Sequence, residues 1–349
     1  MSIELSRDGA RMASVLLAGL RKIYRNDCLA RDSSCRGKAV DGHSVQNSVV
    51  LDALAENNHV SMVTLTGDSM RFELIGRNKA TTFSGFCSNH DRELFKEVDY
   101  AQLRDIDLSS PRQAYQHLLR AAAMELWKKR KAVFISNAIA SRNSDFVRAC
   151  GIMGLNPAGI AFDQESLVPM GYGQRLGLKE SWENYTELRR LTHRSTFSDE
   201  IVFVSRILRV PANFSVVSGV SPTQDLFGSP LYDVGRVIDR DYPMPHMGLA
   251  ILPHGEGTAV LVAMPRKSRF RLQPILDQVA KLPDRELEIP LSKLVINNCE
   301  NSVFKPSAVE SMSADEKGKC LRDYLRSVDE ELSVREIAPI NLFRLGNLA

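Results

Sequence analysis

The order of apolar and polar side chains divides the chain into three zones with different periods. In the first zone, residues 59–65 (HVSMVTL) and 70–76 (MRFELIG) alternate the two classes, and a Gly-containing turn between them completes a predicted β-hairpin. In the second zone, residues 109–140 carry apolar side chains three to four positions apart after a Ser-Ser-Pro start, which predicts a long helix. From about residue 199 the two-residue alternation returns.

The third zone is predicted to be an antiparallel sheet with closing helices. Its alternating segments are separated by Gly and Pro and cover residues 200–210, 213–221 and 247–265. The apolar run LSKLVIN at 291–297 is predicted to be a further buried strand. Residues 271–282 and 314–332 have helical spacing and predict the closing helices.

Composition and the N-terminal segment indicate a soluble protein. Hydrophobic residues make up 44% and charged residues 25%, as in ordinary globular domains, and no apolar run approaches the roughly 18 residues that a membrane span needs. The N-terminal MSIELSRDGARMASVLLAGLRKIYR has acidic residues ahead of its apolar patch and basic residues on both sides, which predicts an amphipathic helix instead of a signal peptide. We therefore expect a cytoplasmic protein, no membrane contact, and six reduced cysteines.

Clustered cysteines in a reducing compartment suggest a metal before a disulfide. Cys28 and Cys35 stand in a polar loop where thiols have little packing purpose. Cys87 and His90 are one helical turn apart at the predicted start of a helix, so both side chains can reach one ion. The four together make a standard tetrahedral Zn²⁺ shell in a treble-clef arrangement. The alternative is two exposed loop thiols, a small core cysteine and a surface or capping histidine.

The segments CLARDSSC, DGHSVQ and CSNHDR resemble the zinc-containing HNH, or ββα-metal, nuclease family over about residues 26–98. The resemblance implies that His43 is the general base that activates water, and that His90 replaces the last zinc cysteine. It also implies that Asp91 helps to hold a catalytic Mg²⁺ or Mn²⁺. Asp41, in the same element as His43, joins the candidate catalytic residues. An alternative for His43 is a capping role at a predicted helix over residues 44–58.

Basic residues cluster in three short stretches although the formal net charge is only +3. These stretches are LWKKRKAV (126–133), ELRRLTHR (187–194) and PRKSRFRL (265–272). Each could face the phosphates of a nucleic acid or could be an ordinary solvated surface.

The sequence therefore predicts an α+β protein with three parts. These are a treble-clef zinc lobe (1–108), a helical region (109–198), and an α+β lobe with an antiparallel sheet and closing helices (199–349). The predicted function is an HNH-like endonuclease that acts on nucleic acid, as a toxin or antiphage defence effector. The alternative is a non-catalytic zinc module that binds nucleic acid or a partner protein.

Overall fold

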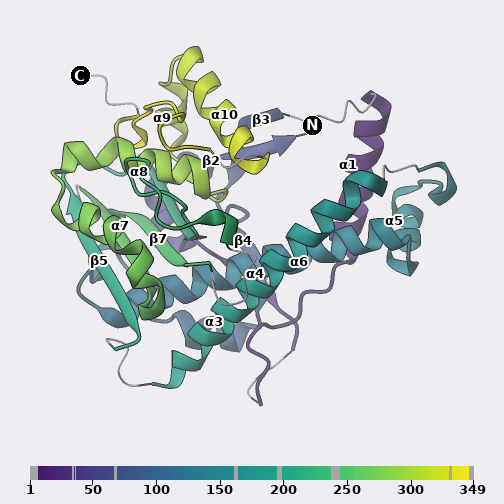
Figure 1. Cartoon of the computed structure of the whole chain (residues 1–349), viewed down its shortest axis with the longest axis horizontal. Helices are drawn as coiled ribbons and strands as arrows, with labels where there is room; N and C mark the ends of the chain where they lie inside the picture. Colours follow the sequence, from purple (N-terminus) through teal and green to yellow (C-terminus); the bar gives the residue numbers. More distant parts are fainter. Residues whose placement is uncertain are drawn as a thin grey trace.

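The computed structural model describes residues 7–33, 35, 37–66, 69–160, 164–194, 199–236, 244–255, 257–329 and 332–345. In this part of the chain a large antiparallel sheet is packed between helices (Figure 1), and two further strands form a separate small sheet. The helical middle and the antiparallel sheet that the sequence predicts are confirmed.

Seven strands form the main sheet, in the order β3-β2-β9-β6-β7-β8-β5, and every neighbouring pair is antiparallel. Their bounds are β2 His59–Thr66, β3 Ser69–Gly76, β5 Ile201–Leu208, β6 Phe214–Val220, β7 Met247–His254, β8 Gly257–Pro265 and β9 Val303–Phe304. The predicted hairpin is β2–β3, with His59 opposite Gly76. Through β9, this hairpin joins the strands of the third zone, so the main sheet draws on both the range 1–108 and the range 199–349.

The helices are α1 Arg7–Ile23, α2 Asp52–Leu54, α3 Ser88–Phe95, α4 Pro111–Ser141, α5 Ser144–Met153, α6 Gln164–Arg190, α7 Arg269–Lys281, α8 Asp284–Asn298, α9 Pro306–Glu310 and α10 Ala314–Asp329. Short 3-10 turns and one π-helical turn, Asn47–Leu51, complete the regular structure of the described residues. None of the helices described is long and apolar enough to cross a membrane.

Helix α4 lies against one face of the main sheet, with α6 alongside it (Figure 1). It begins at Pro111 because the Ser110 hydroxyl accepts a hydrogen bond from the Gln113 N–H and Pro111 favours the first helical position. Gly248 on β7 lets the helix come close, since a Cβ there would lie 3.1 Å from the Leu118 Cα. The side chains of the first half of α4 are consequently almost all buried.

The opposite face of the sheet carries a second core. Val216, Leu249 and Val262 pack there against apolar residues of α7 and α8. Both faces of the central strands are therefore covered, which explains why β7 and β8 are buried along nearly their whole length.

The two-stranded sheet pairs β1 (Val40–His43) with β4 (Thr82–Phe86), and α3 follows β4 directly. The chain between β1 and β4 contains the hairpin β2–β3, which pairs with the main sheet. Segments far apart in the sequence are thereby held together where the cysteine loop, β1 and α3 meet.

Two local predictions differ from the structure. Residues 291–297 belong to helix α8 and not to a strand, because Leu287, Leu291 and Leu294 continue a helical spacing that the short apolar run alone does not reveal. The helix predicted over 44–58 is reduced to the π-helical turn and α2. The helix ends at Leu54 because Ala55 is extended, with a ψ of 139°, and Asn57 and Asn58 then adopt left-handed φ values of 51° and 60° as the chain turns into β2.

Candidate metal centre

The loop after α1 carries the first two cysteines of the centre. An isolated β-bridge between Asp27 and Lys38 closes this loop, and the Leu29 N–H donates to the Gly85 carbonyl of β4 over 2.8 Å. The indole N–H of Trp127 donates to the Asn26 side-chain oxygen over 2.7 Å. The loop is thus fixed both to the small sheet and to α4.

The other two side chains come from the start of α3. Cys87 is the N-cap residue, and its carbonyl accepts the first helical hydrogen bond, from the Asp91 N–H over 2.9 Å. His90 lies three positions after Cys87, so both side chains project from the same side of the first turn.

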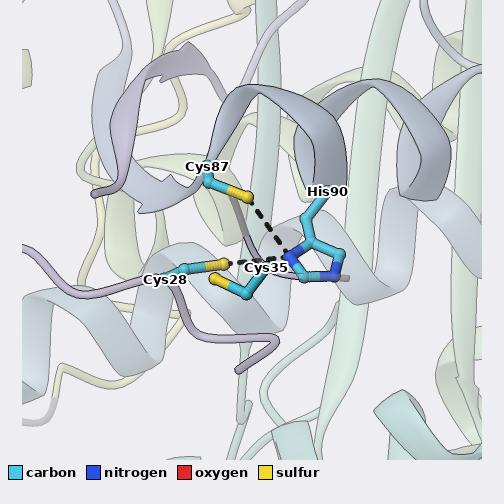
Figure 2. Close-up of side chains that lie close together, drawn as sticks. All are labelled: Cys28, Cys35, Cys87 and His90. Atoms are coloured by element: carbon cyan, nitrogen blue, oxygen red, sulfur yellow. Dashed lines mark hydrogen bonds between the residues drawn. The ribbon is translucent and has the colours of Figure 1, made fainter. Parts of the chain in front are cut away.

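The four side chains converge, as Figure 2 shows. One ligand atom from each of Cys28, Cys35, Cys87 and His90 lies within 4.8 Å of all the others. The Nδ1 atom of His90 is 3.2 Å from the Cys28 Sγ and 3.3 Å from the Cys87 Sγ. A tetrahedral zinc site with ordinary bond lengths places sulfur and nitrogen ligands about 3.5 Å apart. The group could therefore hold a metal ion with little rearrangement.

The orientation of the His90 ring supports this interpretation. Its Nε2 donates a hydrogen bond to the Asp32 carboxylate over 2.9 Å, which leaves the single lone pair of the neutral ring on Nδ1. One lone pair cannot accept a well-aligned hydrogen bond from two thiols at once, whereas it can bind one ion that both sulfurs also bind. A carboxylate behind a ligating imidazole is the usual arrangement at protein metal sites.

Burial also suits a metal site. Cys28, Cys87 and His90 are only 2%, 1% and 4% exposed, and Cys35 is half-buried. Burial raises the pKa of the Cys28 thiol, against the opposing effect of backbone N–H groups that point at its sulfur. A bound cation would reverse that shift, since a coordinating thiol is deprotonated. None of the six cysteines forms a disulfide in the structure.

Of the candidate catalytic residues, Asp91 directly follows the ligand His90 on α3, and His43 is the last residue of β1, opposite Thr82 of β4. The His43 Nδ1 donates to the Ala80 carbonyl over 2.9 Å, which places the lone pair of the neutral ring on Nε2. Burial lowers the pKa of His43, and the hydrogen bond to Ala80 offsets only part of this shift, so the ring is neutral at pH 7. A Cβ at Gly42 would lie 3.0 Å from the Asp91 Oδ1, so the carboxylate packs directly against β1.

Asp91 has a buried basic neighbour that the sequence did not indicate. Burial raises the pKa of Asp91, and the guanidinium of Arg120 opposes this rise. Arg120 itself is paired with Asp99 over 2.8 Å and lies over the ring of Phe95. Nothing in the spacing of α4 distinguishes Arg120 from its other basic residues, so sequence patterns could not have identified it.

Asp41 is placed differently from the other two candidates. Its side chain is exposed and accepts a hydrogen bond from the Ser84 hydroxyl of β4 over 2.5 Å. This contact ties the two strands of the small sheet together. Asp32 is the other site residue that the sequence analysis missed, although its position between Cys28 and Cys35 was a usable signal.

Comparison of the chain with protein-family models, curated proteins and solved structures finds no match in any of the three.

Proposed function

We propose that the chain is a metal-dependent nuclease whose N-terminal part is an HNH-like treble clef built around Zn²⁺. The order of its elements supports the treble clef: a loop with two ligands, the strand pair β1–β4, and then α3 with two more ligands. Three thiolates and one imidazole favour zinc over Mg²⁺ or Ca²⁺, which prefer oxygen ligands.

The observation that carries the proposal is that Asp91 directly follows the ligand His90 and lies near His43. In the first turn of α3, His90 is directed at the sulfur atoms, while Asp91 is turned by roughly 100° and contacts β1. The two candidates are close enough for their charges to affect each other. One helical turn therefore supplies both a metal ligand and a carboxylate beside a neutral histidine.

The chemistry assigned to these residues is hydrolysis of a phosphodiester. The Nε2 atom of His43 would take a proton from a water molecule, whose oxygen attacks the phosphorus and displaces the leaving oxygen. The hydrogen bond to the Ala80 carbonyl holds the ring in the tautomer needed for this step. A Mg²⁺ or Mn²⁺ bound at Asp91 would offset the negative charge that develops on the phosphate.

The test is cleavage of single-stranded and duplex DNA and RNA with added Mg²⁺ or Mn²⁺. His43→Ala should lower the rate by roughly 10²- to 10⁴-fold, because it removes the general base, and should leave the zinc content unchanged. Asp91→Asn should also abolish cleavage with zinc retained. His90→Ala should instead release zinc and destabilise the lobe.

Two matched variants control for the loss of a histidine or a carboxylate as such. His59→Ala changes a histidine whose ring donates a hydrogen bond to the nearby Asn57 carbonyl. Glu93→Gln changes an exposed carboxylate on α3. Full activity in His43→Ala would refute the assignment of His43 as the general base and, with it, the HNH-like mechanism. A parent protein that cleaves none of these substrates would leave the non-catalytic zinc module as the function.

A further inference from the structure

A cavity of about 340 Å³ opens beside the metal centre, between the cysteine loop, α4 and α6. We call it the arginine pocket. It is lined by four arginines, Trp182, Tyr185 and Thr186, together with residues 28–30. The four arginines are Arg31, Arg130, Arg189 and Arg190.

The charge of this pocket has one sign. None of the residues that line it is acidic. Arg31 is paired with Asp27 and Arg189 with Asp32, and both aspartates belong to the cysteine loop. In the part of the chain described, Arg130 and Arg190 have no carboxylate partner. The pocket therefore presents uncompensated positive charge, which favours a ligand with phosphate groups.

Other basic positions of the same stretches are already neutralised. Lys128 is paired with Glu300, Lys129 with Glu125 and Lys267 with Glu187. Arginines from two of the three basic stretches meet at the arginine pocket, and no acidic residue lines this pocket.

An aromatic side chain at the pocket provides a second, independent observation. Trp182 is 49% exposed, although a large apolar ring usually gains free energy from burial. It lies on α6 one turn before Thr186 and two turns before Arg189, so these side chains follow one side of the helix. An exposed indole next to arginines can stack on a nucleobase while the guanidinium groups bind the adjoining phosphates.

We propose that the arginine pocket binds single-stranded nucleic acid, with one base stacked on Trp182 and neighbouring phosphates held by Arg130 and Arg190. In a duplex the base faces are already stacked, so Trp182 would gain nothing from them. The inference rests on the proposed function and narrows its substrate class to unpaired strands.

The pocket is connected to the metal centre through one carboxylate. Asp32 accepts hydrogen bonds from both the His90 Nε2 and Arg189, each over 2.9 Å. Because Arg31 and residues 28–30 belong to the cysteine loop, loss of the metal would also remove one wall of the pocket. Binding of single strands should therefore require the zinc-loaded protein.

Intrinsic fluorescence offers a direct test, because the chain has only two tryptophans. Trp127 is half-buried and hydrogen-bonded to Asn26, whereas Trp182 lies at the pocket. Titration of the zinc-loaded protein with a short oligothymidylate, without added divalent cation, should quench the emission. The quenching should be lost in Trp182→Ala while the emission of Trp127 remains.

Affinity is measured in parallel by anisotropy of a labelled oligothymidylate. Trp182→Ala should weaken binding by roughly five- to a hundredfold, and Trp182→Phe should retain most of the affinity. Arg130→Gln and Arg190→Gln should each reduce the slope of log affinity against log salt by about 0.7. Two control variants should bind like the parent. Arg175→Gln changes an exposed arginine on α6, and Phe270→Ala removes a 92% exposed ring on α7.

Three results would overturn the inference. These are a parent protein that does not bind the oligothymidylate at low salt, a Trp182→Ala variant with parental affinity, and a duplex that binds as tightly as the single strand. The nuclease proposal fails separately. If binding depends on Trp182 but the protein cleaves nothing with Mg²⁺ or Mn²⁺, the nuclease proposal alone is refuted. If the protein cleaves and Trp182→Ala binds the oligothymidylate like the parent, the arginine-pocket proposal alone is refuted.

Discussion

Asp32 is the residue whose removal tests the metal centre without touching a ligand. Its Oδ1 accepts the His90 Nε2–H and its Oδ2 accepts from Arg189. Asp32→Ala would leave all four ligand atoms in place but would free the imidazole to rotate and to change tautomer. We therefore expect zinc to bind more weakly while the stoichiometry stays the same.

The size of the effect follows from the position of the carboxylate. Changes to a residue that orients a metal ligand typically cost 10- to 100-fold in metal affinity. Asp32 is 39% exposed on its side chain, so solvent screens part of its interaction and the effect should lie at the lower end. A tenfold loss of affinity corresponds to about 1.4 kcal/mol. The free energy of unfolding at a fixed, saturating concentration of free zinc should fall by the same amount.

The assay is competition for Zn²⁺ between the protein and a chromophoric chelator of known affinity. Asp27→Ala is the matched control, because Asp27 lies in the same loop and its carboxylate pairs with Arg31 and not with a ligand. Equal zinc affinities for Asp32→Ala and the parent would refute the assignment of Nδ1 as the ligand atom. If Asp32→Ala and Asp27→Ala lose the same zinc affinity, the cause is a general disturbance of the loop and not the loss of the hydrogen bond to His90.

Three further predictions concern packing and protonation. Gly42→Ala should reduce cleavage but retain zinc, because the new Cβ would lie 3.0 Å from the Asp91 Oδ1 and would displace this carboxylate. The cleavage rate and the metal content are measured on the same preparation. Gly248→Ala should lower the free energy of unfolding by about 1–3 kcal/mol in urea titrations, because its Cβ would press on the Leu118 backbone. Burial lowers the pKa of His117 to about 3, so the unfolded chain takes up a proton that the folded chain does not as pH falls below about 6.5. The free energy of unfolding should therefore fall by about 2 kcal/mol between pH 7 and pH 5 because of His117. In His117→Gln the free energy of unfolding should change less over the same pH range.

Local patterns were sufficient for the long elements of the fold. The hairpin over residues 59–76 and helix α4 follow from periodicity and from turn and capping residues, which act over a few positions. The run at 291–297 was misassigned because seven apolar-rich residues fit a buried strand as well as one side of a helix. Only its continuation from Leu287 distinguishes the two.

Long-range pairing was beyond the sequence. No local signal states that β9, two residues long, joins the hairpin β2–β3 to β6, or that β1 pairs with β4 across the intervening hairpin. The four candidate ligands could be grouped because thiols are rare and their loop is polar. Asp32 could have been added from its position between Cys28 and Cys35, but Arg120 and the Ala80 carbonyl, which contact the candidate catalytic residues, acquire their roles only from the tertiary arrangement.

The metal content of the purified protein tests the central claim most directly. Elemental analysis of the parent should find about one zinc per chain, and Cys87→Ser and His90→Ala should lose it together with the stability of the N-terminal lobe. Cys150→Ser is the matched control, because this buried cysteine is not among the four clustered residues and should leave the zinc content unchanged. A parent protein that contains no zinc, and that binds none when zinc is supplied to the reduced protein, would contradict the account.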